Sequence, residues 1–273
     1  MATPSRIAVI KLGALGDMML AMPLIRAIGA HHAGASLHLL TVPAFAPLFD
    51  GWDGLAITAV PRRGAGAFLR MLRFLRSGFD RIYDLQGNDR TAILCALSGV
   101  RDIAGNHPRF PWTLHPPDRW HGQCHIFTRM NAVLAAAGVP PAPETGWMPI
   151  PAGAQAQADA WLGEHGVDPD AFVLVHAGAS AGRPEKRWPG FATLVPMLRG
   201  AGLAVVAVGT TVDADINREL AAAGAVDATG AFGIAALAAL AQRARFALTN
   251  DSGPMHVIAT AGIPVYAFFG PSN

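Results

Sequence analysis

Short apolar runs alternate with longer amphipathic or small-residue segments along the whole chain. The apolar runs predict strands and the intervening segments predict helices. Because the alternation occurs once in each half of the chain, it favours two parallel sheets, each with helices on both faces. The predicted strands are residues 7–11, 36–41, 55–60, 79–85, 100–104, 172–176, 203–209, 246–249 and 264–269, and the predicted helices are residues 17–30, 66–77, 89–97, 191–199, 213–222 and 234–242.

A proline-rich segment separates the two halves. Residues 139–151 contain five prolines, which cannot continue a helix. A chain of 273 residues is long enough for two domains of typical size. We therefore expect one domain at residues 1–145 and a second at residues 146–273.

Composition narrows the class of protein. Hydrophobic residues make up 52% of the chain and charged residues 15%, which is typical of a packed globular protein. No apolar run reaches the length of a membrane span, and the N-terminus lacks the features of a signal peptide, so a cytoplasmic location is expected. Two cysteines, Cys95 and Cys124, are too few for a disulfide framework. The histidines and cysteine of residues 121–125 have no second ligand cluster with zinc-type spacing, which disfavours a metal site.

Charge is divided unevenly between the halves. Residues 1–150 hold 14 basic and 9 acidic residues, a net charge of +5, whereas residues 151–273 hold 7 and 10, a net charge of −3. The first half therefore favours an anionic partner. Only two of the 21 basic residues are lysines, Lys11 and Lys186. A lysine carries a compact ammonium on a flexible side chain, so it suits sites where the planar guanidinium of arginine does not fit.

The segment TNDSGPMH at residues 249–256 carries the strongest local signal. It lies between an apolar run and a small-residue run, so it predicts a strand, a tight turn and a helix start. Asp251 or Ser252 can cap that helix, and Pro254 suits the first helical position. Such a helix start presents free N–H groups to a phosphate. An ordinary capped turn is the alternative.

The N-terminal strand leads into a second glycine turn, KLGALGD, at residues 11–17. Its glycines, Gly13 and Gly16, have the spacing G-x-x-G and not the G-x-G-x-x-G of dinucleotide-binding proteins. A dehydrogenase is therefore disfavoured.

These two turns occur together with PEKRWP at residues 184–189, DLQG at 84–87 and FGPS at 269–272. In this order and spacing the motifs resemble glycosyltransferase family nine, the ADP-heptose:lipopolysaccharide heptosyltransferases. The resemblance implies an α/β protein of GT-B architecture, in which two doubly wound Rossmann-like domains face each other across a cleft. It also implies that residues 1–145 bind the acceptor and residues 146–273 bind the nucleotide-sugar donor.

The resemblance assigns the chemistry to two residues. Asp17 would be the general base that takes the proton of the acceptor hydroxyl, and Lys186 would stabilise the charge on the leaving diphosphate. From the residues alone, Asp17 could instead cap its helix, and Lys186 could be a solvated loop lysine. With a lysine and a helix start at the diphosphate, the resemblance implies a metal-independent reaction without a cofactor. The D-x-D spelling at residues 213–215 lies at a predicted helix start and is not expected to hold a metal.

The resemblance also implies binding residues in each domain. The donor site is expected to use backbone amides and polar side chains of the second domain, with Asp213 at the ribose, Asp251 at the sugar hydroxyls, and Ser252 and Gly253 at the diphosphate. The acceptor site is expected to use glycines and arginines that follow strands of the first domain, where an anionic Kdo-containing lipid needs cationic contacts. The donor residues are Gly178, Ser180, Asp213, Asp251, Ser252, Gly253 and His256, and the acceptor residues are Gly13, Gly16, Arg62 and Arg63.

A basic amphipathic helix is predicted in the first domain. Arg70, Arg73 and Arg76 recur every three residues, so they share one side of a helix whose other side is apolar. Such a helix can lie on the anionic inner face of the cytoplasmic membrane, or it can be a solvated face of a packed helix. A nucleic-acid partner is disfavoured because no stacking aromatics or binding motif accompany the charge.

Together these features predict an inverting, metal-independent glycosyltransferase that moves heptose or a related sugar from an ADP-sugar to lipopolysaccharide core or a related glycan. It would be cytoplasmic and peripheral to the membrane. Two alternatives remain: a GT-B-fold sugar-nucleotide epimerase, and an inactive, truncated nucleotide-sugar binding protein. The apolar run at residues 264–269 predicts a strand buried on both faces. Because relatives continue past it, the resemblance implies a C-terminal truncation with an exposed apolar patch and little activity.

Overall fold

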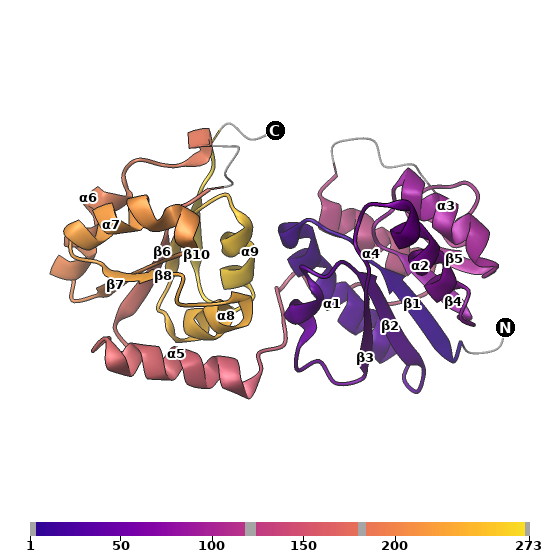
Figure 1. The fold of residues 1–273 in the computed structure, drawn as a ribbon, viewed down its shortest axis with the longest axis horizontal. Coiled ribbons are helices and arrows are strands. Elements are labelled where there is room, and N and C mark those ends of the chain that lie inside the picture. Colours follow the sequence, from indigo (N-terminus) through magenta and orange to yellow (C-terminus); the bar gives the residue numbers. More distant parts are fainter. Residues whose placement is uncertain (1–3, 118–123, 180–183, 271–273) are drawn as a thin grey trace. The chain divides into compact units, whose positions relative to one another are not determined.

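The computed structural model describes residues 4–117, 124–179 and 184–270. The chain forms two compact units, Met1–Met148 and Pro149–Asn273 (Figure 1). The division lies within the proline-rich segment, three residues from the boundary expected above. Each unit is an α/β layer structure with its own parallel sheet, which is the predicted fold class.

The first unit is built on a five-stranded parallel sheet in the order β3-β2-β1-β4-β5. The central strand, β1, pairs with β2 on one side and β4 on the other, so that Ile7 lies between Leu37 and Arg81. This strand is buried on both faces, as its continuous apolar sequence predicts. The strands are β1 (Arg6–Ile10), β2 (Ser36–Thr41), β3 (Leu55–Ala59), β4 (Arg81–Asp84) and β5 (Asp102–Ala104).

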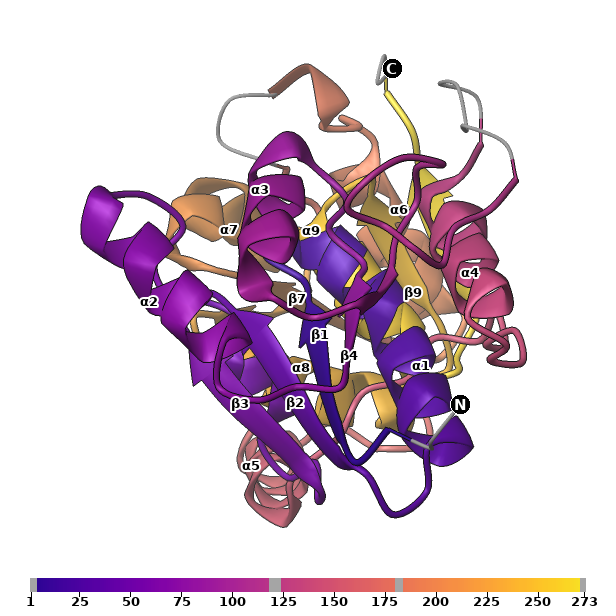
Figure 2. The ribbon, with the colours of Figure 1, turned by 90° about the vertical axis from the view of Figure 1, so that its right-hand side faces the viewer.

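Helices cover both faces of this sheet. Figure 2 shows α1 and α4 on one side of the strands and α2 and α3 on the other. Successive crossovers in opposite directions place them so, because parallel connections are right-handed. The helices are α1 (Leu15–His31), α2 (Ala65–Leu75), α3 (Asp89–Ser98) and α4 (Ile126–Ala136), with the short 3₁₀ turn η1 (Ala46–Phe49).

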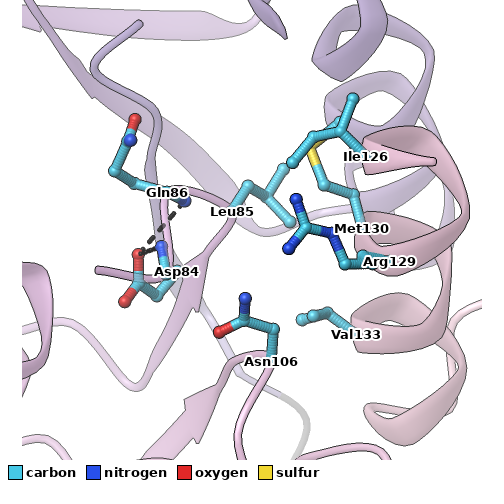
Figure 3. A pocket seen from close by; sticks show the side chains of 9 residues that line it. Asp84, Leu85, Gln86, Asn106, Ile126, Arg129, Met130 and Val133 are labelled. Carbon is cyan, nitrogen blue, oxygen red and sulfur yellow. Dashed lines mark hydrogen bonds between the residues drawn. The ribbon is translucent and has the colours of Figure 1, made fainter. Parts of the chain in front are cut away.

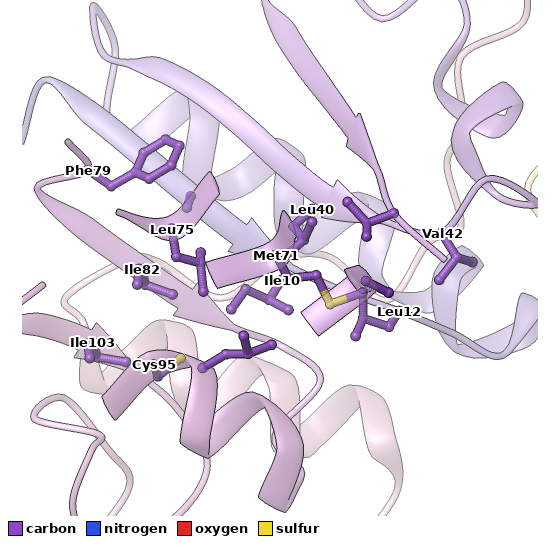
Figure 4. Packing of buried hydrophobic residues seen from close by; sticks show 14 of the residues in the cluster. Ile10, Leu12, Leu40, Val42, Met71, Leu75, Phe79, Ile82, Cys95 and Ile103 are labelled. Carbon is purple, nitrogen blue, oxygen red and sulfur yellow. The ribbon is translucent and has the colours of Figure 1, made fainter. Parts of the chain in front are cut away.

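The hydrophobic core on the α2–α3 side shows why these helices hold their positions. Met71 and Leu75 of α2 are fully buried against Ile10 and Ile82 of the sheet (Figure 4). Met71 and Leu75 are four residues apart and therefore lie on one face of the helix. The arginines of α2 lie on the opposite, exposed face.

The second unit repeats this topology. Its parallel sheet has the order β10-β9-β6-β7-β8, so the first strand of the unit, β6, is again central and pairs with the fourth, β9. Side chains of β6 alternate between two cores, with Phe172 and Leu174 in one and Val173 and Val175 in the other. The strands are β6 (Phe172–His176), β7 (Ala204–Gly209), β8 (Val226–Thr229), β9 (Ala247–Asn250) and β10 (Val265–Phe268).

The helices of the second unit also form two layers. Contacts join α6 to α7 on one face of the sheet, and join α8 to both α5 and α9 on the other. The helices are α5 (Ala152–Glu164), α6 (Phe191–Gly200), α7 (Ala214–Ala222), α8 (Ile234–Arg243) and α9 (Gly253–Ala259), with the 3₁₀ turns η2 (Pro184–Lys186) and η3 (Thr211–Asp213).

Every strand and helix predicted above is present, with ends that shift by up to two residues. Three elements were not predicted: α4, α5 and β8. In α5 only Ala158 and Leu162 are buried, so the helix lacks a strong apolar stripe. The strand β8 is four residues long and lies at a sheet edge. Weak or short apolar patterns of this kind give little signal.

The prediction for the last strand is wrong in one respect. β10 is an edge strand and is not buried on both faces. Phe268 stacks on Trp188 with ring centroids 4.1 Å apart, whereas Tyr266 is 58% exposed and Phe269, just after the strand, is 69% exposed. An edge position leaves one side without a neighbouring strand, and an apolar sequence does not reveal that position. No helix in the described residues is long and apolar enough to cross a membrane.

Candidate active site

Both units place polar residues at the point where the strand order reverses. In the first unit this point lies between β1 and β4, and in the second between β6 and β9. Ligands of open parallel sheets bind at the carboxyl ends of the strands at such a point. The motifs singled out in the sequence follow these four strands, with Asp17 after β1 and Asp251 after β9.

A buried lysine and a half-exposed carboxylate form the centre of the first site. Lys11, directly after β1, has a side chain that is 1% exposed, and its Nζ donates to the carbonyl of Leu85 at 3.3 Å. Its Nζ also lies 3.9 Å from Oδ2 of Asp17, whose side chain is 40% exposed. Burial lowers the pKa of Lys11, while the nearby carboxylates of Asp17 and Asp84 oppose that shift.

Asp17 does not cap its helix. It is the third residue of α1, whose N-cap position is held by Ala14 without any side-chain hydrogen bond. Its carboxylate is therefore available to solvent on one side and is held by Lys11 on the other. This is an arrangement that can accept a proton from a hydroxyl.

Arg62 holds the glycine turn that precedes Asp17. Its guanidinium donates to the carbonyl of Leu12, and the carbonyl of Arg62 in turn accepts from Arg90. A Cβ on Gly13 would meet the Arg62 guanidinium, and Gly13 has φ +134°, so glycine is required there. Two further predicted acceptor residues lie nearby in the chain: Gly16 is the second residue of α1, and Arg63 is exposed in the loop before α2.

The DLQG segment supports the same turn from β4. Oε1 of Gln86 accepts from the backbone N–H of Leu12 at 2.9 Å. Asp84 is fully buried and accepts from the N–H of Gly87 at 2.9 Å and from Nε1 of Trp112 at 3.1 Å. Burial raises the pKa of Asp84, and these donors oppose the shift. Gln86 and Asp84 thus position the loop and are not exposed site groups.

In the second unit Lys186 and Asp251 form an ion pair. Nζ of Lys186 lies 2.7 Å from Oδ2 of Asp251, and the side chains are 16% and 21% exposed. The two residues are 65 positions apart in the sequence. The fold therefore brings the PEKRWP and NDSGPMH motifs together, as a common donor site requires.

Ser252 occupies the N-cap position of α9, but its side chain makes no capping hydrogen bond. Its Oγ lies 3.2 Å from Nδ1 of His176, which ends β6. Burial lowers the pKa of His176, while the carboxylate of Asp213 opposes the shift. The side chain of Ser252 therefore does not cap α9, because its hydroxyl contacts the buried imidazole of His176. Gly253 and Pro254 are the first two residues of α9, and His256 is the fourth.

Asn250 fastens the loops of this site to one another. Its Nδ2 donates to the carbonyls of Ala177 at 2.8 Å and Gly178 at 3.2 Å, and its Oδ1 accepts from the N–H of Trp188 at 3.0 Å. The side chain is fully buried. One amide thus joins the end of β6, the Lys186 loop and the end of β9.

Gly178 and Asp213 lie against each other. A Cβ on Gly178 would come within 2.1 Å of Oδ1 of Asp213, so only glycine fits. Asp213 is 5% exposed, and its Oδ2 accepts from the N–H of Thr210 at 2.9 Å and from Thr210 Oγ1 at 3.1 Å. Asp213 ends the 3₁₀ turn η3, one residue before the helix that was predicted to include it. Half of its carboxylate is used to shape this turn.

Some predicted residues lie outside the described part of the chain. Ser180 of the donor site does, as do His121, Gly122 and Gln123 of the segment weighed as a metal site. Within residues 4–117, 124–179 and 184–270 no group of three or more His, Cys, Asp or Glu side chains could hold a metal ion.

Three residues of these sites were not predicted from the sequence: Asn250, His176 and Gln86. All three lie in or beside the motifs named above, so their positions in the sequence indicated that they belong to the sites. Their roles could not be predicted, because each depends on a hydrogen bond to a residue more than 60 positions away in the sequence.

The sequence and the fold of this chain are both similar to those of known proteins. Residues 68–273 match the sequence model of Glycosyltransferase family 9 (heptosyltransferase). No curated protein matches the sequence. The crystal structure of a family 9 glycosyl transferase from Veillonella parvula is similar with a TM-score of 0.84 and 25% identity, covering 98% of this chain and 81% of that chain.

Two structures from Escherichia coli have the same fold. ADP-heptose LPS heptosyltransferase II gives a TM-score of 0.73 at 23% identity, covering 98% of this chain and 86% of the other. Heptosyltransferase WaaC with ADP-2-deoxy-2-fluoro heptose gives 0.72 at 18% identity, covering 98% and 90%.

Proposed function

This chain belongs to glycosyltransferase family 9 and is a glycosyltransferase of the heptosyltransferase family, and we propose that it transfers heptose from ADP-heptose to an anionic lipid-linked glycan with inversion. The observation that carries the proposal is the half-exposed carboxylate of Asp17, fixed beside the buried ammonium of Lys11. The donor assignment is supported by the E. coli heptosyltransferase, similar in fold, whose structure contains ADP-2-deoxy-2-fluoro heptose.

The transfer is a single displacement. The acceptor hydroxyl oxygen attacks the anomeric carbon of the heptose while the bond from that carbon to the diphosphate oxygen breaks. Asp17 takes the hydroxyl proton, and ADP leaves with the electron pair. Attack from the face opposite the leaving group inverts the configuration. Lys11, whose Nζ lies 3.9 Å from Oδ2 of Asp17, helps to orient the carboxylate.

Lys186 supplies the positive charge at the leaving group. Its ammonium is paired with Asp251 at 2.7 Å. A diphosphate oxygen can replace that carboxylate, which then becomes free to accept hydrogen bonds from sugar hydroxyls. Charge-assisted hydrogen bonds of this kind contribute about 1.5–3 kcal/mol each.

Product analysis tests the proposed function. Purified protein is incubated with radiolabelled ADP-heptose and a Kdo-lipid acceptor, with and without EDTA. Labelled lipid and free ADP support transfer, and unchanged rates in EDTA support the role of Lys186. Epimerised nucleotide-sugar would identify the epimerase alternative, and binding without any turnover would identify an inactive binding protein.

We further propose that the exposed face of α2 and α3 lies on the anionic inner face of the cytoplasmic membrane. Arg70 and Arg73 of α2 are exposed beside Leu69, which is 60% exposed. On the neighbouring helix α3, Ile93 and Leu97 are 53% and 43% exposed. Apolar side chains among arginines favour a membrane interface over bulk water.

Vesicle sedimentation tests this surface. The protein should bind vesicles that contain phosphatidylglycerol, and binding should fall with salt. The double variant Arg70→Glu and Arg73→Glu should bind at least about thirtyfold less, because each basic residue near the surface contributes about 1 kcal/mol. Arg218→Glu, on the second unit and 73% exposed, is the control. Equal binding to uncharged vesicles would contradict the proposal.

A further inference from the structure

His176 lies between two polar residues of the second unit that come from different elements. It is the last residue of β6, and its side chain is buried. Its Nδ1 lies 3.2 Å from Oγ of Ser252, which is also buried and stands at the start of α9. One ring nitrogen is therefore in contact with a hydroxyl group, which can either donate or accept a hydrogen bond.

The other ring nitrogen faces the carboxylate of Asp213. A Cβ on Gly178 would lie 3.1 Å from Nε2 of His176 and 2.1 Å from Oδ1 of Asp213, so both atoms border the same small space beside the glycine. Oδ2 of Asp213 already accepts from the N–H and the hydroxyl of Thr210, which leaves Oδ1 to face the imidazole. The imidazole thus has a hydroxyl on one side and a carboxylate on the other.

A neutral imidazole cannot serve both neighbours fully, because it carries one N–H and one unprotonated nitrogen. If Nε2 carries the hydrogen, it donates towards Asp213, and Nδ1 accepts the hydroxyl hydrogen of Ser252. That hydrogen is then unavailable to a ligand. If Nδ1 carries the hydrogen, Ser252 keeps its own hydrogen for a ligand, but the lone pair of Nε2 then faces a carboxylate. Only the imidazolium donates on both sides and leaves the Ser252 hydroxyl able to donate as well.

Two charged side chains act on this imidazole from the elements around it. Asp213, at the end of η3, favours the protonated form, whereas Arg187, directly after η2, opposes it. Burial is the largest effect and lowers the pKa of His176, so the imidazole is neutral at neutral pH. The nearby ion pair of Lys186 and Asp251 adds no net charge. A bound diphosphate would add negative charge and so favour the imidazolium.

We propose that His176 is a positioning residue of the donor site and takes up one proton from solvent when the diphosphate of the nucleotide-sugar binds. The imidazolium then donates to Asp213 and to Ser252, and the Ser252 hydroxyl donates to a diphosphate oxygen. Ser252 is within reach because it directly follows Asp251, whose place at Lys186 the diphosphate takes. The proton returns to solvent when the nucleotide leaves. The inference rests on the proposed function, because it needs a diphosphate in this site.

The pH dependence of donor affinity follows from this proton. Binding that takes up a proton becomes tighter as the pH falls, and one proton limits the change to about tenfold per pH unit. Affinity of the wild-type protein should therefore rise about three- to tenfold between about pH 8 and pH 6. A residue that only supports the fold would change affinity by the same factor at both pH values.

Proton uptake is measured by calorimetric titration with ADP-heptose, without acceptor and in EDTA, in two buffers that differ in ionisation enthalpy. Both phosphates of this ligand are esterified and do not titrate near neutral pH, so the uptake belongs to the protein. At a pH of about 6.5, the ordinary pKa of an imidazole, the wild-type protein should take up about half a proton or more per ligand bound. His176→Asn keeps an amide near the position of Nδ1 but cannot take up a proton, so it should lose this uptake and the pH dependence.

Two further variants separate proton uptake from a general disturbance of the site. Thr249→Val removes a buried hydroxyl beside His176 in the sheet, whose Oγ1 has no hydrogen-bond partner in the described residues, and it should keep the wild-type uptake. Ser252→Ala removes the group that needs the second N–H, so it should lower the uptake while His176 stays in place. NMR of ¹⁵N-labelled histidine should show the His176 signal, identified by its absence in His176→Asn, change from a neutral to a doubly protonated imidazole on binding.

Three results would overturn the inference. They are equal proton uptake in wild type and His176→Asn, an imidazole at His176 that stays neutral in the complex, and an affinity loss in His176→Asn that is the same at both pH values. If His176→Asn does not fold, Ser252→Ala and the NMR signal of the wild-type protein decide the question.

These results are distinguishable from failure of the proposed function. If transfer occurs and ADP-heptose binds without proton uptake, only the role of His176 is wrong. If transfer fails while the uptake depends on His176, the proposed function is wrong and the proton-coupled site stands. If ADP-heptose does not bind, the difference in uptake between wild type and His176→Asn is measured with ADP, whose terminal phosphate titrates equally in both. Failure to bind either nucleotide would overturn both proposals.

Discussion

The two units have the same strand order around the same reversal point, yet they hold their site charges differently. In the first unit the ammonium of Lys11 is 1% exposed, and the carboxylate beside it is 40% exposed. In the second unit the members of the Lys186–Asp251 pair are 16% and 21% exposed, and Asn250, the fully buried side chain that joins the loops of this site, is an uncharged amide. The same strand order therefore supports two different arrangements of charged side chains.

The difference follows from what each site must do. A general base needs a carboxylate that is oriented and open to the acceptor, and a buried ammonium behind a partly exposed carboxylate provides that orientation. A donor site needs charges that can exchange partners when a diphosphate arrives, which a short, partly exposed pair allows. The uncharged amide of Asn250 keeps the loops in place without adding charge.

The largest expected effect is on the first site. Asp17→Asn should lower turnover about a hundredfold or more, the usual contribution of a general base, and leave ADP affinity unchanged. Steady-state transfer assays with ADP titration measure both. Asp89→Asn, which changes an exposed first-turn carboxylate of α3, is the matched control. Wild-type turnover in Asp17→Asn would remove this residue from the reaction.

The next effect is on the network of the second site. Asn250→Ala leaves the carbonyl of Ala177 and the N–H of Trp188 unpaired, so it should destabilise the protein by about 2 kcal/mol and weaken ADP binding. Asn131→Ala removes a similar amide from the first unit, where it bonds Ala142. Urea unfolding should detect both changes, and only Asn250→Ala should weaken ADP binding. Equal ADP affinity in the two variants would contradict the assignment of the donor site to the second unit.

Lys186→Ala should weaken ADP binding about tenfold, because it removes one charge-assisted hydrogen bond. Lys186→Arg keeps the charge and should lose less. Calorimetric titration with ADP in EDTA measures the affinities. Activity of the wild-type protein that disappears in EDTA and returns with magnesium would show that the leaving group depends on a metal and not on Lys186 alone.

The smallest effect concerns a buried histidine far from the reversal point in the first unit. Burial lowers the pKa of His32 from 6.5 to about 4, with smaller contributions from His31 and Arg81, and Nε2 of His32 lies 2.7 Å from the Tyr83 hydroxyl. The unfolded chain therefore takes up a proton before the folded one does. Stability should be complete above pH 6.5 and should fall by about 1 kcal/mol as the pH drops towards 4.

His32→Gln should flatten this pH dependence and leave transfer unchanged, whereas His31→Gln, an exposed neighbour, should keep the wild-type profile. Urea unfolding at pH 7 and pH 4.5 measures the difference. A wild-type pH profile in His32→Gln would show that another group is responsible.

The sequence by itself determined the architecture and the location of the sites. Continuous apolar runs such as that of β6 can be satisfied only inside a covered parallel sheet, and glycine-rich turns after such runs mark the carboxyl edge. The position of Asp17 and Asp251 directly after such strands could be predicted in this way, whereas their roles and that of Lys186 came from the resemblance to glycosyltransferase family nine. The four-residue strand β8 and the alanine-rich helix α5 could not, since their apolar patterns are too weak.

Only the tertiary structure decided which partner each side chain has. Asp251 or Ser252 was expected to cap α9; Ser252 holds the N-cap position, but its hydroxyl contacts His176, which is 76 positions away. The guanidinium of Arg62, a predicted acceptor residue, donates to the carbonyl of Leu12, a contact that the sequence did not indicate. Arg129 and Asn106 belong to no motif, and they line the same hollow (Figure 3) only because α4 packs beside the end of β5. Local sequence patterns determine the backbone of a segment, whereas hydrogen bonds and burial depend on residues that the chain brings near only after it has folded.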